Sequence, residues 1–288
     1  MKRKLIKWLI ALVILASIAT WVIVEAMVLA PNRIDIKNET IVFPQLPEDF
    51  EDLRILFFSD LHYSKFMDYA RAKPVFDLIN QLSPDLIIFT GDLFDHPSVT
   101  IPTEKQIEEL TELFSQLKAP YGIYAVWGNH DLESPSSKSI IQSIYDQSDV
   151  RLLVNQSVRV YASYSSFIQL VGLDSQLLGN PRIDEALRGL DKNALTIALS
   201  HTPDIADDLK DTHVDWQLSG HSHGGQISLP FYGAIMKVPY ARNYTHGTYL
   251  VDSLRLDVTA GLGTTRIDAR FFANPEIHLF TLTSQPKE

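Results

Sequence analysis

The feature that most constrains the fold of this chain is a repeated pattern in which a short apolar run ends in a polar cluster. The runs are rich in Ile, Leu, Val and Phe, which is typical of strands that are buried on both faces of a sheet. They are LRILFFS (53–59), DLIIFT (85–90), YGIYAVW (121–127), ALTIALS (194–200) and VDWQLSG (214–220).

Segments with helical character separate these runs. We expect helices around 70–82, 104–118 and 137–147, and a short helix after Pro203. Thr103 and Gln106 have the spacing of a capping box at the start of the second helix. Strands that alternate with helices in this way predict a mixed α/β sandwich.

Further β-like segments lie on either side of this region. A candidate first strand covers 34–43, and strand-like segments (RLLVN, SVRVYAS and SFIQLVGL) lie between 151 and 173. The tail from Gln226 to Leu282 consists mostly of short β runs broken by Gly and Pro. Because we find no internal repeat and no linker, we expect an anchor over 1–30, a tether with the candidate strand over 31–52, and one domain over 53–288.

The polar clusters at the ends of the apolar runs carry the candidate chemistry. Loops beyond the carboxyl ends of strands are where α/β sheets bind ligands, so we expect the clusters to converge on one rim. In chain order they contain Asp60 and His62; Gly91 and Asp92; Gly128, Asn129, His130 and Asp131; His201; and Gly220, His221 and His223.

Several clusters also have an ordinary structural explanation. The Asp60 and Asp92 segments could be turns, and His201 could be a polar strand end. GNHD (128–131) is harder to explain by packing, because three polar residues in succession follow a buried strand. GHSHGG (220–225) is the most specific, since two alternating histidines flanked by glycines suit metal ligation better than core filling.

Composition excludes other classes of site and partner. The chain has no cysteine, which removes disulfide scaffolds, thiolate zinc sites and cysteine nucleophiles. It contains no H-E-x-x-H, the signature of another class of hydrolase. Its net charge of -10 argues against general nucleic-acid binding, because affinity for a phosphate backbone comes mainly from clustered Lys and Arg.

The ordered set D-x-H, G-D, G-N-H-D, a single His and G-H-x-H resembles the calcineurin-like metallophosphoesterases. The blocks that carry the resemblance are FFSDLH, FTGDLFD, VWGNHD, LSHTPD and LSGHSHGGQ, which extend over about 53–226. GLGTT (261–265) and FFANPEIHLFTL (271–282) resemble the tail of the small membrane-associated bacterial branch of that family. The resemblance implies a four-layer α/β/β/α sandwich that hydrolyses phosphoester or phosphoanhydride bonds.

The resemblance also implies two divalent metal ions, of Mn, Fe or Zn, in a dinuclear site. One ion would be held by Asp60, His62, Asp92 and His223, and the other by Asp92, Asn129, His201 and His221, so that Asp92 bridges them. Mixed carboxylate, amide and imidazole ligands suit these metals better than calcium. Two such cations can activate water and clamp phosphoryl oxygens.

His130 and Asp131 are the candidate catalytic residues. The resemblance implies that His130 lies beside the metals and stabilises the transition state or protonates the leaving oxygen, with Asp131 as its orienting partner. A helix N-cap near Ser134 is the structural alternative for Asp131. His96 either lines the pocket or, more simply, lies on a surface loop, and Arg266 and Arg270 are candidates for phosphate binding or for surface ion pairs.

The N-terminal segment predicts a single-pass membrane anchor. MKRKLIK (1–7) precedes an apolar run from Trp8 to Val24, which reaches Leu29 if Glu25 lies near an interface. Twenty-two helical residues span about 33 Å, against a hydrocarbon core of about 30 Å. We favour an uncleaved anchor over a signal peptide, whose apolar part is shorter. The excess of Lys and Arg before the run predicts a cytoplasmic N-terminus and an extracytoplasmic domain.

These observations predict a phosphodiesterase or pyrophosphatase of the cell membrane that acts on a membrane- or envelope-associated phosphate ester. The branch includes enzymes that act on lipids of the UDP-diacylglucosamine type. An outward-facing domain would not meet such a cytoplasmic lipid, so cell-wall and phospholipid phosphates are comparable candidates. The alternative is a membrane-tethered metal-binding protein without turnover, which predicts lost ligands or a lost catalytic His, and neither is seen.

Overall fold

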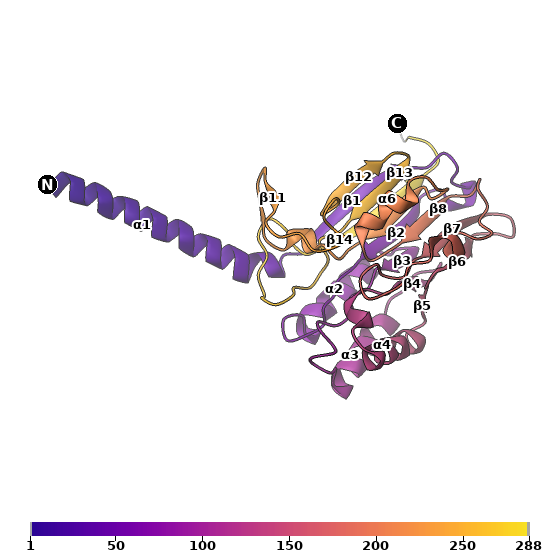
Figure 1. Cartoon of the computed structure of the whole chain (residues 1–288), viewed down its shortest axis with the longest axis horizontal. Helices are drawn as coiled ribbons and strands as arrows, with labels where there is room; N and C mark the ends of the chain where they lie inside the picture. Colours follow the sequence, from indigo (N-terminus) through magenta and orange to yellow (C-terminus); the bar gives the residue numbers. More distant parts are fainter. Residues whose placement is uncertain (1, 287–288) are drawn as a thin grey trace.

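Two six-stranded sheets pack face to face in the computed structural model, which describes residues 2–286 (Figure 1). The central strands of the first sheet are parallel, and its C-terminal strand β14 inserts antiparallel beside β2 and parallel to β1. Its order is β1 (Asp35–Val42), β14 (Glu276–Thr283), β2 (Leu53–Phe58), β3 (Leu86–Phe89), β4 (Ile123–Ala125) and β5 (Val150–Leu152).

The second sheet has four parallel strands in its centre and an antiparallel strand at each edge. Its order is β12 (Gly247–Val251), β13 (Leu254–Val258), β9 (Trp216–Ser219), β8 (Thr196–Leu199), β7 (Phe167–Gly172) and β6 (Gln156–Tyr161). A separate small hairpin joins β10 (Ser228–Leu229) to β11 (Gly233–Ala234).

Helices cover the outer face of each sheet, so the expected four-layer α/β/β/α sandwich is confirmed. The first sheet is covered by α2 (Tyr69–Gln81), α3 (Glu104–Ser115) and α4 (Pro135–Gln147). The second is covered by the short helices α5 (Ile183–Ala186) and α6 (Ala206–Leu209). A third hydrophobic cluster lies between the two sheets.

Strand β2 shows why these runs are mostly apolar. Side chains alternate between the two faces of a strand, and here both faces are covered. Leu56 and Phe58 pack under the helices, whereas Ile55 and Phe57 pack between the sheets. All four side chains are therefore removed from water, and the strand can position polar residues only where it ends.

The helices begin where the sequence predicts. Thr103 and Gln106 form the expected reciprocal capping box of α3. Asp68 caps α2 and Ser134 caps α4, each by accepting a hydrogen bond from a backbone N–H of the first turn. The candidate strand over 34–43 is β1, which pairs with β14 along its whole length.

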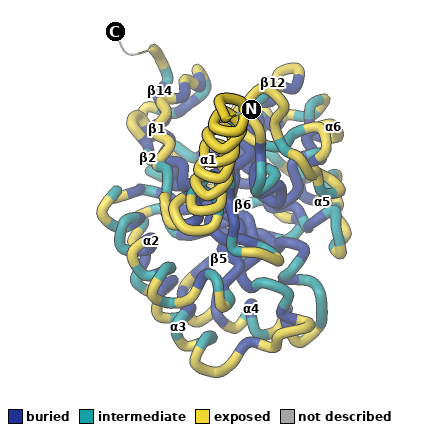
Figure 2. The backbone as a smooth tube through the Cα atoms, turned by 90° about the vertical axis from the view of Figure 1, so that its left-hand side faces the viewer, coloured by how far each residue is buried: buried dark blue, intermediate teal, exposed yellow. Residues whose placement is uncertain are grey.

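The apolar N-terminal helix α1 (Lys2–Val24) projects from the domain, and none of its residues is buried (Figures 1 and 2). A π-helical turn (Glu25–Leu29) and a 3-10 turn (Ala30–Asn32) continue it into the domain. The helix is long and apolar enough to cross a membrane, a test that a signal sequence also passes. Glu25, which interrupts the apolar run, forms an ion pair with Arg33 at 2.9 Å.

Candidate metal centre

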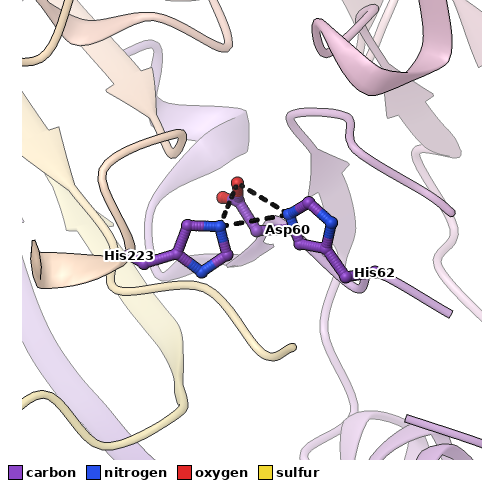
Figure 3. A group of neighbouring side chains, drawn as sticks. All are labelled: Asp60, His62 and His223. Carbon is purple, nitrogen blue, oxygen red and sulfur yellow. Dashed lines mark hydrogen bonds and ion pairs between the residues drawn. The ribbon is translucent and has the colours of Figure 1, made fainter. Parts of the chain in front are cut away.

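The polar clusters that follow β2, β3, β4, β8 and β9 lie together at one end of the sandwich. Asp60, His62 and His223 form the first group (Figure 3). The His223 Nε2 lies 3.6 Å from Asp60 Oδ1, and the His62 Nε2 lies 3.7 Å from the same oxygen. The two imidazole nitrogens are 3.1 Å apart. Three ligand atoms from two distant segments therefore face one small volume.

Asp92, His201 and His221 form the second group. The His201 Nε2 lies 3.2 Å from Asp92 Oδ2, and the His62 Nε2 of the first group lies 3.5 Å from that same oxygen. The Asp92 carboxylate thus lies between the two groups. Asn129 lies beside them at the end of β4, and its buried side-chain oxygen has no hydrogen-bond partner.

The hydrogen bonds of the histidines leave ring nitrogens available for a cation. The His201 Nδ1 donates to the Thr90 carbonyl at 2.7 Å, so the neutral form of His201 carries its lone pair on Nε2, and this nitrogen makes no hydrogen bond of normal geometry. The His221 Nε2 donates to the Pro239 carbonyl at 2.8 Å, which leaves Nδ1 free. Such bonds fix the tautomer of metal-binding histidines, and the residues present fit a divalent metal site.

The backbone at the site adopts left-handed conformations that ordinary residues rarely use. The φ angles are 53° at Asp60, 46° at His62, 59° at Asp92, 68° at His221 and 52° at His223. Non-glycine residues in this region are uncommon and cluster at functional sites. Backbone bonds such as Asp60 N–H to the Gly91 carbonyl, at 3.0 Å, hold these turns in place.

Two glycines allow the loops to approach closely. A side chain at Gly128 would overlap the Asp92 carboxylate, and one at Gly220 would overlap Ser59 and the Asp60 carboxylate. The glycines of GNHD and GHSHGG are therefore required by the short distance between neighbouring loops.

Burial and charge set the protonation of the site. Burial raises the pKa of Asp60 and Asp92, but the nearby histidines, His201 above all, hold both pKa values below the usual range. Burial lowers the pKa of His62 and His201, yet Asp60, Asp92 and Asp95 outweigh it and raise these values to about 10 and about 9. In the folded protein, His62 and His201 are therefore protonated at neutral pH when no cation is bound.

The other two histidines behave in the opposite way. Burial dominates at His221 and lowers its pKa to about 4, and it lowers the pKa of His223 to about 3. Both are therefore neutral at pH 7, which is the form that ligates metals.

The expected pairing of His130 with Asp131 is wrong. The His130 Nδ1 contacts Glu133 Oε1 at 2.6 Å instead. The Asp131 carboxylate is fully buried and accepts backbone N–H bonds from Asp92 (2.9 Å), Leu93 (2.9 Å) and Gly128 (2.8 Å). Asp131 does not cap α4 either, since Ser134 does. It holds the loops after β3 and β4 together.

Glu133 organises a small network beside the metal ligands. It also accepts from the Ser98 hydroxyl at 2.5 Å and contacts His96 Nδ1 at 2.8 Å, so His96, whose side chain is 44% exposed on its loop, also belongs to this network. The His130 Nε2 lies 4.0 Å from Asp92 Oδ2 and faces the site. His130 opens a 3-10 turn, in which residues three apart lie on the same side, so Glu133 and not Asp131 meets its ring.

Arg270 is not a phosphate-binding residue. Its fully buried guanidinium donates to the carbonyls of Gly261, Gly263 and Ala273. These hydrogen bonds hold the tail segment 261–273 in place next to Asp60. Burial lowers the pKa of Arg270 to about 10, which leaves it charged at neutral pH. Arg266 is exposed.

The comparisons with known proteins agree with this geometry. A family model described as calcineurin-like phosphoesterase matches residues 53–225, which include the metal-site candidates. This chain belongs to the calcineurin-like phosphoesterase family. Membership supports the assignment of the protein as a phosphoester hydrolase, a class that typically uses divalent metals.

Three curated relatives of this calcineurin-like phosphoesterase cover most of its length. The uncharacterized metallophosphoesterase YkuE of Bacillus subtilis is 38% identical over 90% of this chain and 89% of its own. The uncharacterized metallophosphoesterase YkoQ of Bacillus subtilis is 30% identical over 92% and 97%. The UDP-2,3-diacylglucosamine pyrophosphatase LpxG of Chlamydia trachomatis is 29% identical over 76% and 77%.

Glu133 and Asp131 have different expected mutational phenotypes. We expect Glu133→Gln to lower kcat about ten- to a hundredfold with little change in Tm, because it weakens the support of His130. Asp131→Asn should instead lower the free energy of unfolding by about 1–3 kcal/mol, because an amide cannot accept all three buried backbone bonds. Steady-state kinetics and urea unfolding of metal-free protein measure both. An Asp131→Asn variant of normal stability and low kcat would restore Asp131 as the partner of His130.

Metal loading should release protons. At pH 7 His62 and His201 carry protons in metal-free protein, and ligation requires their neutral forms, so about two protons should leave per chain. The apparent metal affinity should rise with pH until about pH 9–10, the range of these two pKa values. Calorimetric titrations with Mn in buffers of different ionisation enthalpy measure the release. Loading without proton release would contradict the assigned protonation.

Proposed function

We propose that this phosphoester hydrolase holds two divalent cations that share Asp92, and that it cleaves phosphodiesters or pyrophosphates at the membrane. The observation that carries the proposal is the position of Asp92 Oδ2, which lies 3.5 Å from a nitrogen of one ligand group and 3.2 Å from a nitrogen of the other. A carboxylate in this position is suited to bridge two ions.

Asp60, His62, Asp92 and His223 would hold one cation, and Asp92, Asn129, His201 and His221 the other. The bound cations would supply Lewis acidity, lowering the pKa of water and neutralising charge on the phosphoryl oxygens. The ligand set lacks sulfur and combines carboxylate, amide and imidazole, which suits Mn, Fe or Zn.

His130 is placed to act on the leaving group. Glu133 holds its Nδ1, which turns Nε2 toward the site, where it can donate a proton to the departing oxygen. Burial raises the pKa of Glu133, but the contacts with His130 and Ser98 outweigh it and lower the pKa to about 2, so the Glu133 carboxylate is ionised at neutral pH.

The membrane context narrows the substrate class. The 23 residues of α1 give a helix of about 35 Å, enough to cross a bilayer. The two LpxG relatives are UDP-2,3-diacylglucosamine pyrophosphatases. If the positive N-terminus lies in the cytoplasm, the domain faces outward, where phospholipid and cell-wall phosphates are the accessible substrates.

Metal-dependent turnover of a diester is the direct test of the proposed function. We expect the detergent-solubilised chain, stripped with chelator and reloaded with Mn, to hydrolyse bis-p-nitrophenyl phosphate faster than p-nitrophenyl phosphate. Asp92→Asn should lower kcat by at least about 100-fold, or about 2.7 kcal/mol of barrier, because it disturbs both ions. Asp208→Asn, at an exposed carboxylate, is the matched control. Bound metal without turnover of either ester would favour the tethered binding protein.

The proposed orientation can be tested because the chain has no native cysteine. We expect Tyr164→Cys, at an exposed turn of the domain, to react with a membrane-impermeant maleimide in intact cells. Lys4→Cys, before the apolar run, should react only after permeabilisation. The reverse labelling pattern would place the domain in the cytoplasm.

A further inference from the structure

An exposed apolar surface lies next to the metal centre and outside every hydrophobic core. We call it the hairpin surface, and it consists of Leu229, Phe231, Tyr232, Ile235, Met236 and Phe272. The hairpin β10–β11 and the residues just after it supply all of these except Phe272, which comes from the loop 266–272. Most other exposed apolar side chains of the domain occur singly or in pairs, as at Leu178. A concentration of large apolar groups on one short segment marks an interaction surface.

The hairpin surface is joined to the end of the N-terminal helix. Phe271 packs edge-on against Trp21 of α1, with ring centroids 6.4 Å apart, and the Arg270 N–H donates to the Ala26 carbonyl at 2.8 Å. Phe271 in turn exchanges backbone bonds with Gln226 and Ser228 at the base of the hairpin, at 3.0 and 2.8 Å. Figure 1 shows the hairpin beside the point where α1 enters the domain.

The segment that contains the hairpin differs in charge from the rest of the molecule. Residues 226–251 contain no Asp or Glu, in a chain that has 35 of them. Lys237 and Arg242 are exposed within the segment, and Arg266 is exposed in the neighbouring loop. A protein with a net charge of -10 is repelled by an anionic surface, so an acid-free segment with exposed basic residues is the part best suited to approach one. Asp268 of the neighbouring loop is paired with Arg71 at 2.9 Å.

We propose that the hairpin surface inserts into the interfacial layer of an anionic lipid bilayer, beside the membrane-spanning α1, and that the metal centre takes its phosphate ester from that layer. The inference rests on the proposed function, in which α1 anchors the chain. Aromatic and aliphatic side chains with basic neighbours are the composition of protein segments that lie in the membrane interface.

A cavity lined in part by the hairpin surface extends to the residue that follows a metal-ligand candidate. Its volume is about 460 Å³, and its lining includes Phe231, Tyr232 and Phe272 on the hairpin side and His246 and Tyr249 opposite. Gly224, which directly follows the metal-ligand candidate His223, lies at the same cavity. This cavity offers the polar part of an amphiphile a place next to His223, while its apolar part remains in the lipid layer.

A second copy of this chain is the competing occupant of the hairpin surface. The contact of the loop 266–272 with α1 favours lipid, because α1 is itself exposed along its length and needs an apolar surrounding. The hairpin and α1 share one end of the domain, so a bilayer around α1 lies next to the hairpin.

Fluorescence quenching in vesicles tests the proposal on the full chain. Single cysteines replace Phe231 on the hairpin, Ile14 in α1 and Tyr164, a matched aromatic control that is 103% exposed where Phe231 is 111% exposed. Each carries an environment-sensitive fluorophore in vesicles of phosphatidylcholine and phosphatidylglycerol. We expect doxyl-labelled lipid to quench the probes at 231 and 14, and aqueous iodide to quench the probe at 164. Melting curves confirm that each labelled protein is folded.

The outcomes separate this inference from the anchoring on which it rests. Quenching by lipid at 14 but not at 231 overturns the inference and leaves the anchor intact. Lipid quenching at 231 without quenching at 14 supports docking and rejects the spanning helix, and quenching at neither position rejects both. Lipid quenching at 164 as well as 231 overturns the assignment to this face. A blue shift at 231 that depends on protein density and not on doxyl lipid identifies a second copy as the occupant.

Discussion

The burial of the Asp60 and Asp92 carboxylates at one place is the constraint on which the rest of the site depends. Two ionised groups cannot share a desolvated volume unless positive charge lies between them. Without a cation, protonated His62 and His201 supply it, as their raised pKa values show. Divalent ions supply more charge at the same positions, so the site is stable in the absence of metal and still has a strong electrostatic reason to bind it.

This constraint explains the unfavourable backbone conformations at the site. Sharp turns are needed to bring carboxylates and imidazoles from separate strands together. Asp60, His62 and Asp92 adopt left-handed conformations in these turns. Asp131 compensates by accepting three backbone N–H bonds from two of the loops. Burial, and then the charge of Asp92, raise its pKa to about 6, which shows that the negative charge of this region extends beyond the ligands.

The strands and the converging clusters could be predicted because both depend on local pattern: a run that is buried on both faces is mostly apolar, and the polar cluster follows its end. The partner of His130 could not be predicted from the sequence, since Asp131 and Glu133 are both acidic neighbours and only the path of the 3-10 turn distinguishes them. The role of Arg270 was equally hidden, because nothing in the tail indicates that its guanidinium lies among backbone carbonyls. The hairpin surface was not foreseen either: short β runs broken by Gly and Pro do not show which apolar residues remain exposed.

The connection between α1 and the domain is short and is fixed by contacts with the domain. Ala30 and Pro31 are buried, the Pro31 carbonyl accepts from Arg71 of α2 at 2.7 Å, and β1 begins at Asp35. With α1 in a bilayer, the catalytic centre would be held at a constant height and tilt. Its encounters with substrate would then follow lateral diffusion in two dimensions, and the surface density of the phosphate ester, rather than its bulk concentration, would govern the rate.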